Sequence, residues 1–206
     1  MKILLTAGLI AGMMLMAGAA AAAEPINYDF KNGPDGWMIP DWAMEQKDCV
    51  GKSVEVSTDE AFGGTHALKI MTAYPGNDWT AAVIENDREV TLKGYKHITD
   101  RVYIPKKAKT DLLYGRIIVT AGPWFFIQMR TPVHLERGKR TEIKVPPDDG
   151  ERGELLLWQC NNSDECLLAH LDRVRKIALC IKYNVSAKNQ GPKYNGPVYA
   201  DDITIE

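Results

Sequence analysis

Two stretches of the chain alternate apolar residues with side chains that can stack on a ligand or hydrogen-bond to it. Neighbouring side chains of a β-strand point to opposite faces, so every second residue shares a face. In WFFIQMR (124–130) the face opposite the apolar one carries Trp124, Phe126, Gln128 and Arg130. In LLYGRIIVT (112–120) the corresponding face carries Tyr114, Arg116 and Ile118.

These residue types suit the recognition of a carbohydrate. Sugars present apolar C–H faces edged with hydroxyl groups, so their sites combine flat rings with planar polar side chains. In ELLLWQ (154–159), Trp158 shares a face with Leu156 and Glu154, which predicts a second outward ring. We therefore predict one sheet face that binds a ligand through the following residues: Arg116, Trp124, Gln128 and Trp158, with Lys182 at the rim.

An alternative reading of the same residues stays open. Large aromatic side chains usually cover a sheet or pack beneath a loop, and Trp124 and Phe126 could do only that. Three further aromatic residues flank loops and could extend a site at the edge of the fold: Trp42, Trp79 and Tyr194.

Motifs of known catalytic chemistry are missing. CVGKSVEV (49–56) contains Gly-Lys-Ser, but a phosphate-binding loop needs a glycine where Gln46 stands. Neither Gly-x-Ser-x-Gly nor His-Glu-x-x-His occurs, and the four histidines are scattered singly. We predict that the protein is not an enzyme. A polysaccharide lyase or glycoside hydrolase remains a third reading, because lyase sites leave little local trace.

One acidic residue near the end of the chain is predicted to be structural. In VYADDITIE (198–206), Asp201 shares a strand face with Tyr199, Ile203 and Ile205. An unpaired carboxylate on such an inward face is costly, so Asp201 should have a specific partner.

The cysteines predict disulfides. The chain has four, and an even number favours bridges over free thiols in a protein that is exported, as residues 1–23 predict. The spacing in CNNSDEC suggests Cys160–Cys166, which leaves Cys49 with Cys180. Zinc is the alternative, but no Cys-x-x-Cys or nearby pair of histidines supports it.

The elements that position these residues are short strands. Alternating or continuous apolar runs, rich in β-branched and aromatic residues, are separated by turn sequences such as FGGT, YPGND and NQGPKYNGP. The one helical candidate is a short connector at 164–174. This pattern predicts an all-β antiparallel β-sandwich with a jelly-roll core and one short helix, forming a single domain over residues 24–206.

The N-terminal stretch is predicted to be an export signal. Residues 1–23 combine Lys2, an apolar run and a tract of small residues that ends before Glu24, as in a cleaved signal peptide. We therefore expect a secreted or periplasmic protein with no membrane span after signal removal. The formal net charge of −2 gives no reason to expect a nucleic-acid partner.

Four stretches in order resemble a known family. YDFKNGPDGW (28–37), VSTDEAFGGTHALKI (56–70), DRVYIP (100–105) and the closing VRKIALCIKYN…GPVYADDITIE look like a galactose-binding-domain-like jelly roll, the fold of many non-catalytic carbohydrate-binding modules. The resemblance implies a carbohydrate ligand. A protein-interaction or structural role in the cell envelope, with another envelope protein as partner, is the alternative.

The resemblance also bears on Asp201. In that family an acid at this position helps tie the chain ends together, often through a structural calcium ion. Here Lys31 stands where the family usually has a glutamate, which removes one oxygen ligand. We predict that Asp201 is held by Lys31 or by backbone N–H groups without a metal, and calcium remains the alternative.

Overall fold

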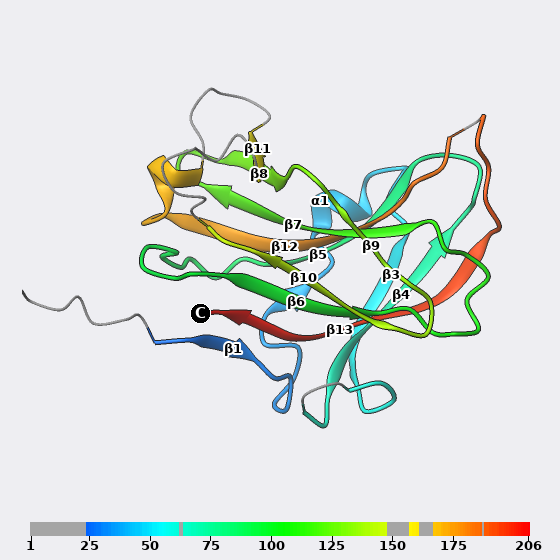
Figure 1. Ribbon diagram of the computed structural model, residues 1–206, viewed down its shortest axis with the longest axis horizontal. Coiled ribbons are helices and arrows are strands. Elements are labelled where there is room, and N and C mark those ends of the chain that lie inside the picture. The colour runs from blue at the N-terminus through cyan, green and yellow to red at the C-terminus, as the bar shows by residue number, and fades with distance from the viewer. Residues whose placement is uncertain (1–23, 62–63, 148–156, 161–166, 187) are drawn as a thin grey trace, which may run out of the picture.

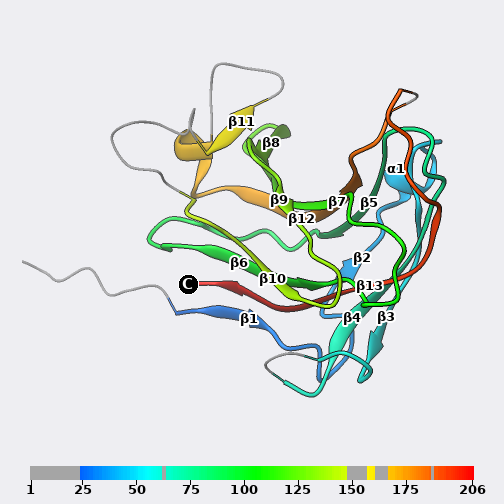
Figure 2. The same ribbon diagram turned by 45° about the vertical axis from the view of Figure 1, so that its right-hand side comes forward.

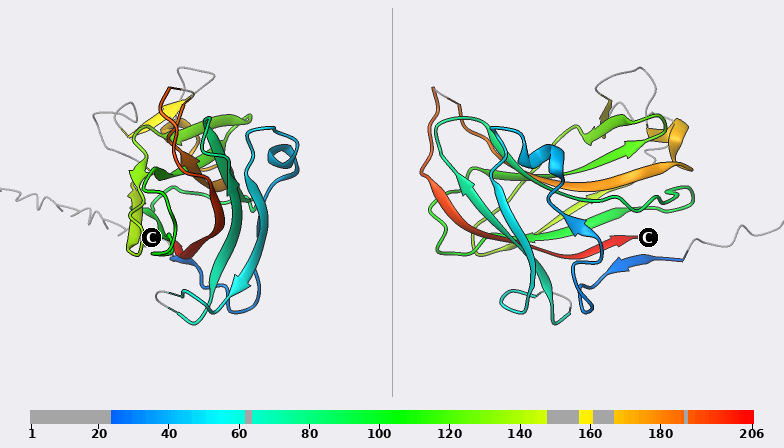
Figure 3. Two further views of the ribbon diagram at one scale, coloured as in Figure 1. Left: turned by 90° about the vertical axis from the view of Figure 1, so that its right-hand side faces the viewer. Right: turned by 180° about the vertical axis from the view of Figure 1, so that it is seen from behind.

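The computed structural model describes residues 24–61, 64–147, 157–160, 167–186 and 188–206. These residues form two antiparallel sheets that face each other across a shared apolar core (Figures 1 and 3). The prediction of an all-β sandwich is confirmed. Residues 1–23, which carry the predicted signal peptide, lie outside the described residues. In the part of the chain that is described, no helix is both long and apolar enough to cross a bilayer.

The first sheet contains six strands in the order β10-β6-β13-β4-β3, with β1 paired to β13. Their bounds are β1 Ile26–Tyr28, β3 Gly51–Ser57, β4 Ala67–Tyr74, β6 Ile98–Tyr103, β10 Arg140–Val145 and β13 Tyr194–Ile205. Because β1 pairs with β13, the first and last described strands lie side by side (Figure 2).

The second sheet contains seven strands in the order β11-β8-β7-β12-β5-β2, with β9 paired to β7. Their bounds are β2 Trp37–Met38, β5 Thr80–Asn86, β7 Leu113–Ala121, β8 Phe125–Met129, β9 Val133–His134, β11 Trp158–Cys160 and β12 Val174–Tyr183. The central strands β5, β7 and β12 are almost continuously apolar. Their inner faces form the core, and β5 is buried on its outer face as well.

Helical structure differs from the prediction. An α-helix, α1 (Asp41–Met44), follows Pro40 and was not foreseen. Within the expected connector the structure has a 3₁₀ helix, η2 (Leu167–His170), while residues 161–166 lie outside the described residues. Four residues are too few to show helical periodicity, so α1 leaves little trace in the sequence.

The end of β13 buries Asp201 as predicted, and of the two predicted partners the structure shows the backbone N–H and not Lys31. Asp201 is 1% exposed and its Oδ1 accepts a hydrogen bond of 2.7 Å from the Asp202 backbone N–H. The pairing with β6 shifts by one residue after Asp201, where Asp202 adopts a φ of 50°. Lys31 does not reach this carboxyl: it is exposed and its Nζ lies 2.7 Å from Asp29 Oδ2. The predicted Lys31 contact is therefore wrong, because the neighbouring aspartate captures the ammonium group.

Candidate functional site

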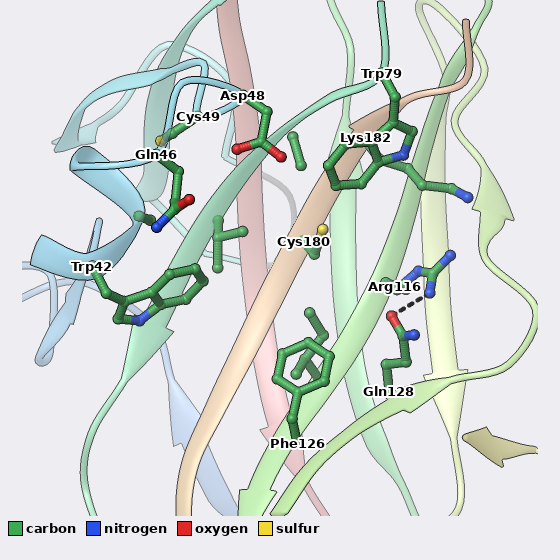
Figure 4. A pocket seen from close by; sticks show the side chains of 14 residues that line it. Trp42, Gln46, Asp48, Cys49, Trp79, Arg116, Phe126, Gln128, Cys180 and Lys182 are labelled. Atoms are coloured by element: carbon green, nitrogen blue, oxygen red, sulfur yellow. Dashed lines mark hydrogen bonds between the residues drawn. The ribbon is translucent and has the colours of Figure 1, made fainter. Parts of the chain in front are cut away.

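The outer face of the second sheet carries a groove with an apolar floor. Strands β5, β7 and β12 place small or branched side chains there, and Phe126 of β8 packs against them. The floor consists of Ala81, Val83, Ile118, Ala178 and Cys180. Because most of these side chains are short, the surface is hollowed, and a pocket of about 530 Å³ opens above it (Figure 4). A second pocket of about 310 Å³ shares Trp42, Val83, Ile118 and Phe126 with the first, so the two adjoin.

Three exposed tryptophans surround this groove. Trp42 and Trp79 line the larger pocket, while Trp124 lines the smaller one together with Trp42. Their exposed fractions are 46%, 45% and 61%, unusually high for the most hydrophobic aromatic side chain. Exposed aromatic rings around an apolar hollow form an apolar patch of the kind that marks a ligand-binding groove or another interaction site.

The local structure holds two of these rings in place. Trp42 is carried by α1, and its indole Nε1–H donates to Glu85 Oε2 at 3.3 Å. Trp124 lies in the tight turn between β7 and β8 with a φ of 77°, a conformation that is strained for a bulky residue. The Arg175 guanidinium lies 4.7 Å from the Trp124 ring centroid and covers one of its faces. The cation contact helps to hold this ring at the rim of the groove.

Polar side chains occupy the other end of the larger pocket. Arg116 Nη1 donates a hydrogen bond to Gln128 Oε1, and Lys182 lies beside them (Figure 4). Burial lowers the pKa of the Lys182 ammonium group, and the positive charge of Arg116 lowers it further. This end therefore combines charged donors with a nearby exposed ring, that of Trp79.

Four of the five predicted ligand-binding residues lie along this groove. Arg116, Gln128 and Lys182 line the larger pocket and Trp124 the adjoining one. The fifth, Trp158, is wrong. It is fully buried, and its indole N–H donates to Pro146 O at 2.9 Å. Strand β11 pairs with β8 so that Trp158 stands opposite the inward-facing Met129, a register that alternation within one strand cannot reveal.

Sequence reasoning missed or undervalued several residues of the site. Trp42 and Trp79 were expected only as an extension at the edge, yet they form walls of the main pocket. Tyr194 is buried and donates to Pro197 O at 2.7 Å, so it does not extend the site. Glu85 and Lys176, which no motif marked, line the smaller pocket. The only signal for Trp42 in the sequence was its position beside a predicted loop.

The predicted Cys49–Cys180 bridge is also wrong, because both residues are free thiols. Strand β5 lies between them. The backbone of Cys49 forms a parallel β-bridge with Ala81 on one side of β5, and Cys180 of β12 pairs with Val83 on the other side. Two strand spacings place the two Cα atoms at least about 9 to 10 Å apart, beyond the Cα separation that a disulfide spans. Cys166 lies outside the described residues, so the Cys160–Cys166 bridge stays a prediction.

Alkylation checks this correction. In denaturant without reductant, iodoacetamide should label both Cys49 and Cys180, as read by peptide mass spectrometry. In the native protein Cys180 should react slowly, because burial raises the pKa of its thiol to about 11. A non-reducing digest that yields a linked Cys49–Cys180 peptide would contradict the structure.

The described residues contain no cluster of three or more His, Cys, Asp or Glu side chains that could hold a metal ion. Near the chain ends two carboxyl groups are buried, Asp100 and Asp201. Calcium takes about six to eight oxygen ligands, so this pair alone would be a poor site. That Asp201 is held without a metal stays a prediction.

Comparison with known proteins supports the fold. Neither a protein-family model nor a curated protein matches the sequence. A family 28 carbohydrate-binding module specific for non-crystalline cellulose superposes with a TM-score of 0.54 at 13% identity, covering 86% of this chain and 91% of that one.

Two further structures are similar. A carbohydrate-binding module from the β-sandwich superfamily, studied for its promiscuous specificity, gives a TM-score of 0.51 at 13% identity over 87% of this chain, which spans 61% of that one. The N-terminal tandem of family 22 modules from Paenibacillus barcinonensis Xyn10C gives 0.50 at 12% identity, over 92% of this chain and 46% of that one. At these identities the likeness shows the fold alone: this chain has the β-sandwich fold of carbohydrate-binding modules.

Proposed function

We propose that the protein is a non-catalytic carbohydrate-binding protein that holds a segment of a polysaccharide in the groove of the second sheet. The observation that carries this proposal is the arrangement of three exposed tryptophan side chains around an apolar floor, with Arg116 and Gln128 at one end of the groove. The similar structures bind carbohydrates by their own descriptions, which supports the same class of ligand here.

The groove can bind a sugar chain by two complementary contacts. Trp42, Trp79 and the open face of Trp124 offer flat surfaces on which the C–H faces of pyranose rings can stack. Arg116, Gln128 and Lys182 offer hydrogen bonds to ring substituents. Since the two pockets adjoin, successive sugars of one chain can occupy them. Sites of this kind bind with about −4 to −7 kcal/mol, millimolar to micromolar.

The charged groups favour holding a ligand over proton transfer. Glu85 is mostly buried at the smaller pocket, and Lys176 Nζ lies 2.5 Å from its Oε1 while Trp42 donates to its Oε2. A carboxylate with both oxygens engaged in this way serves to position Trp42. We further propose that residues 1–23 direct export, which would bring the groove to extracellular or envelope polysaccharides.

Replacement of the groove tryptophans tests the proposal. Trp42→Ala, Trp79→Ala and Trp124→Ala should each weaken polysaccharide binding about tenfold or more, because each removes a large stacking surface. Affinity electrophoresis against soluble glucans, xylans and mannans, followed by calorimetry on the best ligand, measures this.

Met44→Ala is the matched control, since Met44 is exposed on the same helix as Trp42 but does not line the groove. Binding to no polysaccharide, or equal binding by all variants, would contradict the proposal and favour an interaction module. The release of reducing ends or unsaturated products from any substrate would overturn its non-catalytic part.

A further inference from the structure

The two ends of the groove differ in how their positive charges are balanced. At the smaller pocket, Lys176 is neutralised by Glu85 at 2.5 Å. At the larger pocket, Arg116 and Lys182 form no ion pair with any residue in the described ranges, although both are half-buried. Two neighbouring cations without a counter-ion are costly at a partly buried site, so the protein maintains here a charge that its own described residues do not neutralise.

The strand register brings these two cations together. On β7 and β12, Arg116 stands opposite Cys180 and Lys182 stands opposite Tyr114, so the two side chains are diagonal neighbours on one face. The lowered pKa of Lys182, caused by burial and then by Arg116, agrees with this proximity. Figure 4 shows both head groups on the same side of the pocket.

The Arg116 guanidinium is oriented but not saturated. Gln128 accepts a hydrogen bond from Nη1, while Nε is buried without a hydrogen-bond partner among the described residues. A guanidinium offers five N–H donors in a planar fork that matches a carboxylate or another oxyanion. Gln128 is uncharged, so its hydrogen bond orients the Arg116 guanidinium but does not neutralise the positive charge.

Asp48, the one carboxylate among the described residues that line this pocket, does not neutralise these two cations. Asp48 lies across Cys180 from the two head groups (Figure 4), and it makes no ion pair within 4.0 Å with either cation. Trp79 lines the same pocket, with nearly half of its surface exposed. A stacked sugar could therefore carry a negative substituent to Arg116 and Lys182.

We propose that the groove is selective for an anionic glycan, in which a carboxylate or sulfate group is bound by Arg116 and Lys182 while its sugar ring stacks on Trp79. This inference rests on the proposed function and adds the class of its ligand. Hydroxyl groups of a neutral sugar can accept from the same donors, but they leave both charges uncompensated. An oxyanion gives charge-assisted, bidentate bonds, which are shorter and stronger.

Matched pairs of polysaccharides test the charge without altering the protein. Polygalacturonate is compared with its fully methyl-esterified form, and dextran sulfate with dextran, beside the neutral panel used above. We expect one anionic member to bind at least about tenfold more tightly than its neutral counterpart, as for a charge-assisted contact. Binding should weaken between 50 and 500 mM salt. The carboxylate and sulfate pairs identify which anion the site accepts.

Variants then locate the effect. Arg116→Gln and Lys182→Gln should each reduce the preference for the anionic member by about tenfold, and Arg116→Lys should retain part of it. Lys52→Gln, the same charge change on an exposed residue of the first sheet, should leave the preference intact. Melting temperatures confirm that each variant is folded.

The outcomes separate this inference from the proposed function. Equal binding of charged and neutral partners, with loss in the tryptophan variants, would overturn anion selectivity and leave carbohydrate binding in place. Binding to nothing, neutral or anionic, would overturn both. A preference for anions that survives in Arg116→Gln and Lys182→Gln would place the anion elsewhere and contradict the assignment.

Discussion

Asp100→Asn should remove most of the dependence of stability on pH between about pH 4 and pH 8. Asp100 of β6 is 2% exposed, and its Oδ1 has no hydrogen-bond partner among the described residues. Burial raises the pKa of its carboxyl from 3.8 to about 8, and the negative charge of the nearby Asp201 adds to this rise. The folded protein therefore holds a proton at Asp100 that the unfolded chain has already released at neutral pH.

The sign of the effect follows from this difference in pKa. The stability that the proton supplies is fully present below the unfolded pKa near 3.8 and is lost as pH rises through the folded pKa of about 8. Each pH unit in this window costs about 1.4 kcal/mol, so the whole range is on the order of 5 kcal/mol. Asparagine cannot ionise, so the variant should show a nearly flat profile and exceed the wild type at pH 8.

Urea denaturation at a series of pH values measures this profile, with Asp41→Asn as a control on an exposed carboxylate of α1. An unchanged slope in Asp100→Asn would contradict the prediction.

The wild-type protein tests the calcium alternative at Asp201. If EDTA lowers its melting temperature and calcium restores it, a metal ion neutralises the Asp100–Asp201 pair, and the metal-free prediction fails. Without such an effect, the proton on Asp100 is the simpler account.

Trp158→Ala should destabilise the fold severely but leave sugar affinity unchanged in the molecules that remain folded. The indole is fully buried between the sheets, so its removal opens a large cavity and loses the hydrogen bond to Pro146 O. Such truncations cost about 3–5 kcal/mol. Trp79→Ala should do the opposite, with little loss of stability and a large loss of binding, because Trp79 is a half-exposed groove wall.

Denaturant titration and calorimetry on both variants distinguish the two roles. Trp158→Phe keeps a ring in the core and gives a folded comparison if the alanine variant does not accumulate. The interpretation would be refuted if Trp158→Ala were stable yet unable to bind sugar, since that would return Trp158 to the binding face.

Local alternation in the sequence was enough to predict the sandwich and a large part of the candidate site. A two-residue period decides which side of a strand a residue faces, and that placed Arg116 and Gln128 on one outer surface and Asp201 inside. These residues lie within or beside long apolar runs, where the period is unambiguous. A resemblance in four ordered stretches pointed to the same fold.

Only the tertiary structure decided which rings are available to a ligand and which thiols can meet. Trp158 is interior because the pairing of β11 with β8 sets its face, and Cys49 and Cys180 are apart because β5 lies between them. Trp42 becomes a wall of the groove because a four-residue helix sets it over the second sheet. Register and the packing of short loops depend on partners distant in sequence, so the period of a single strand carries no information about them.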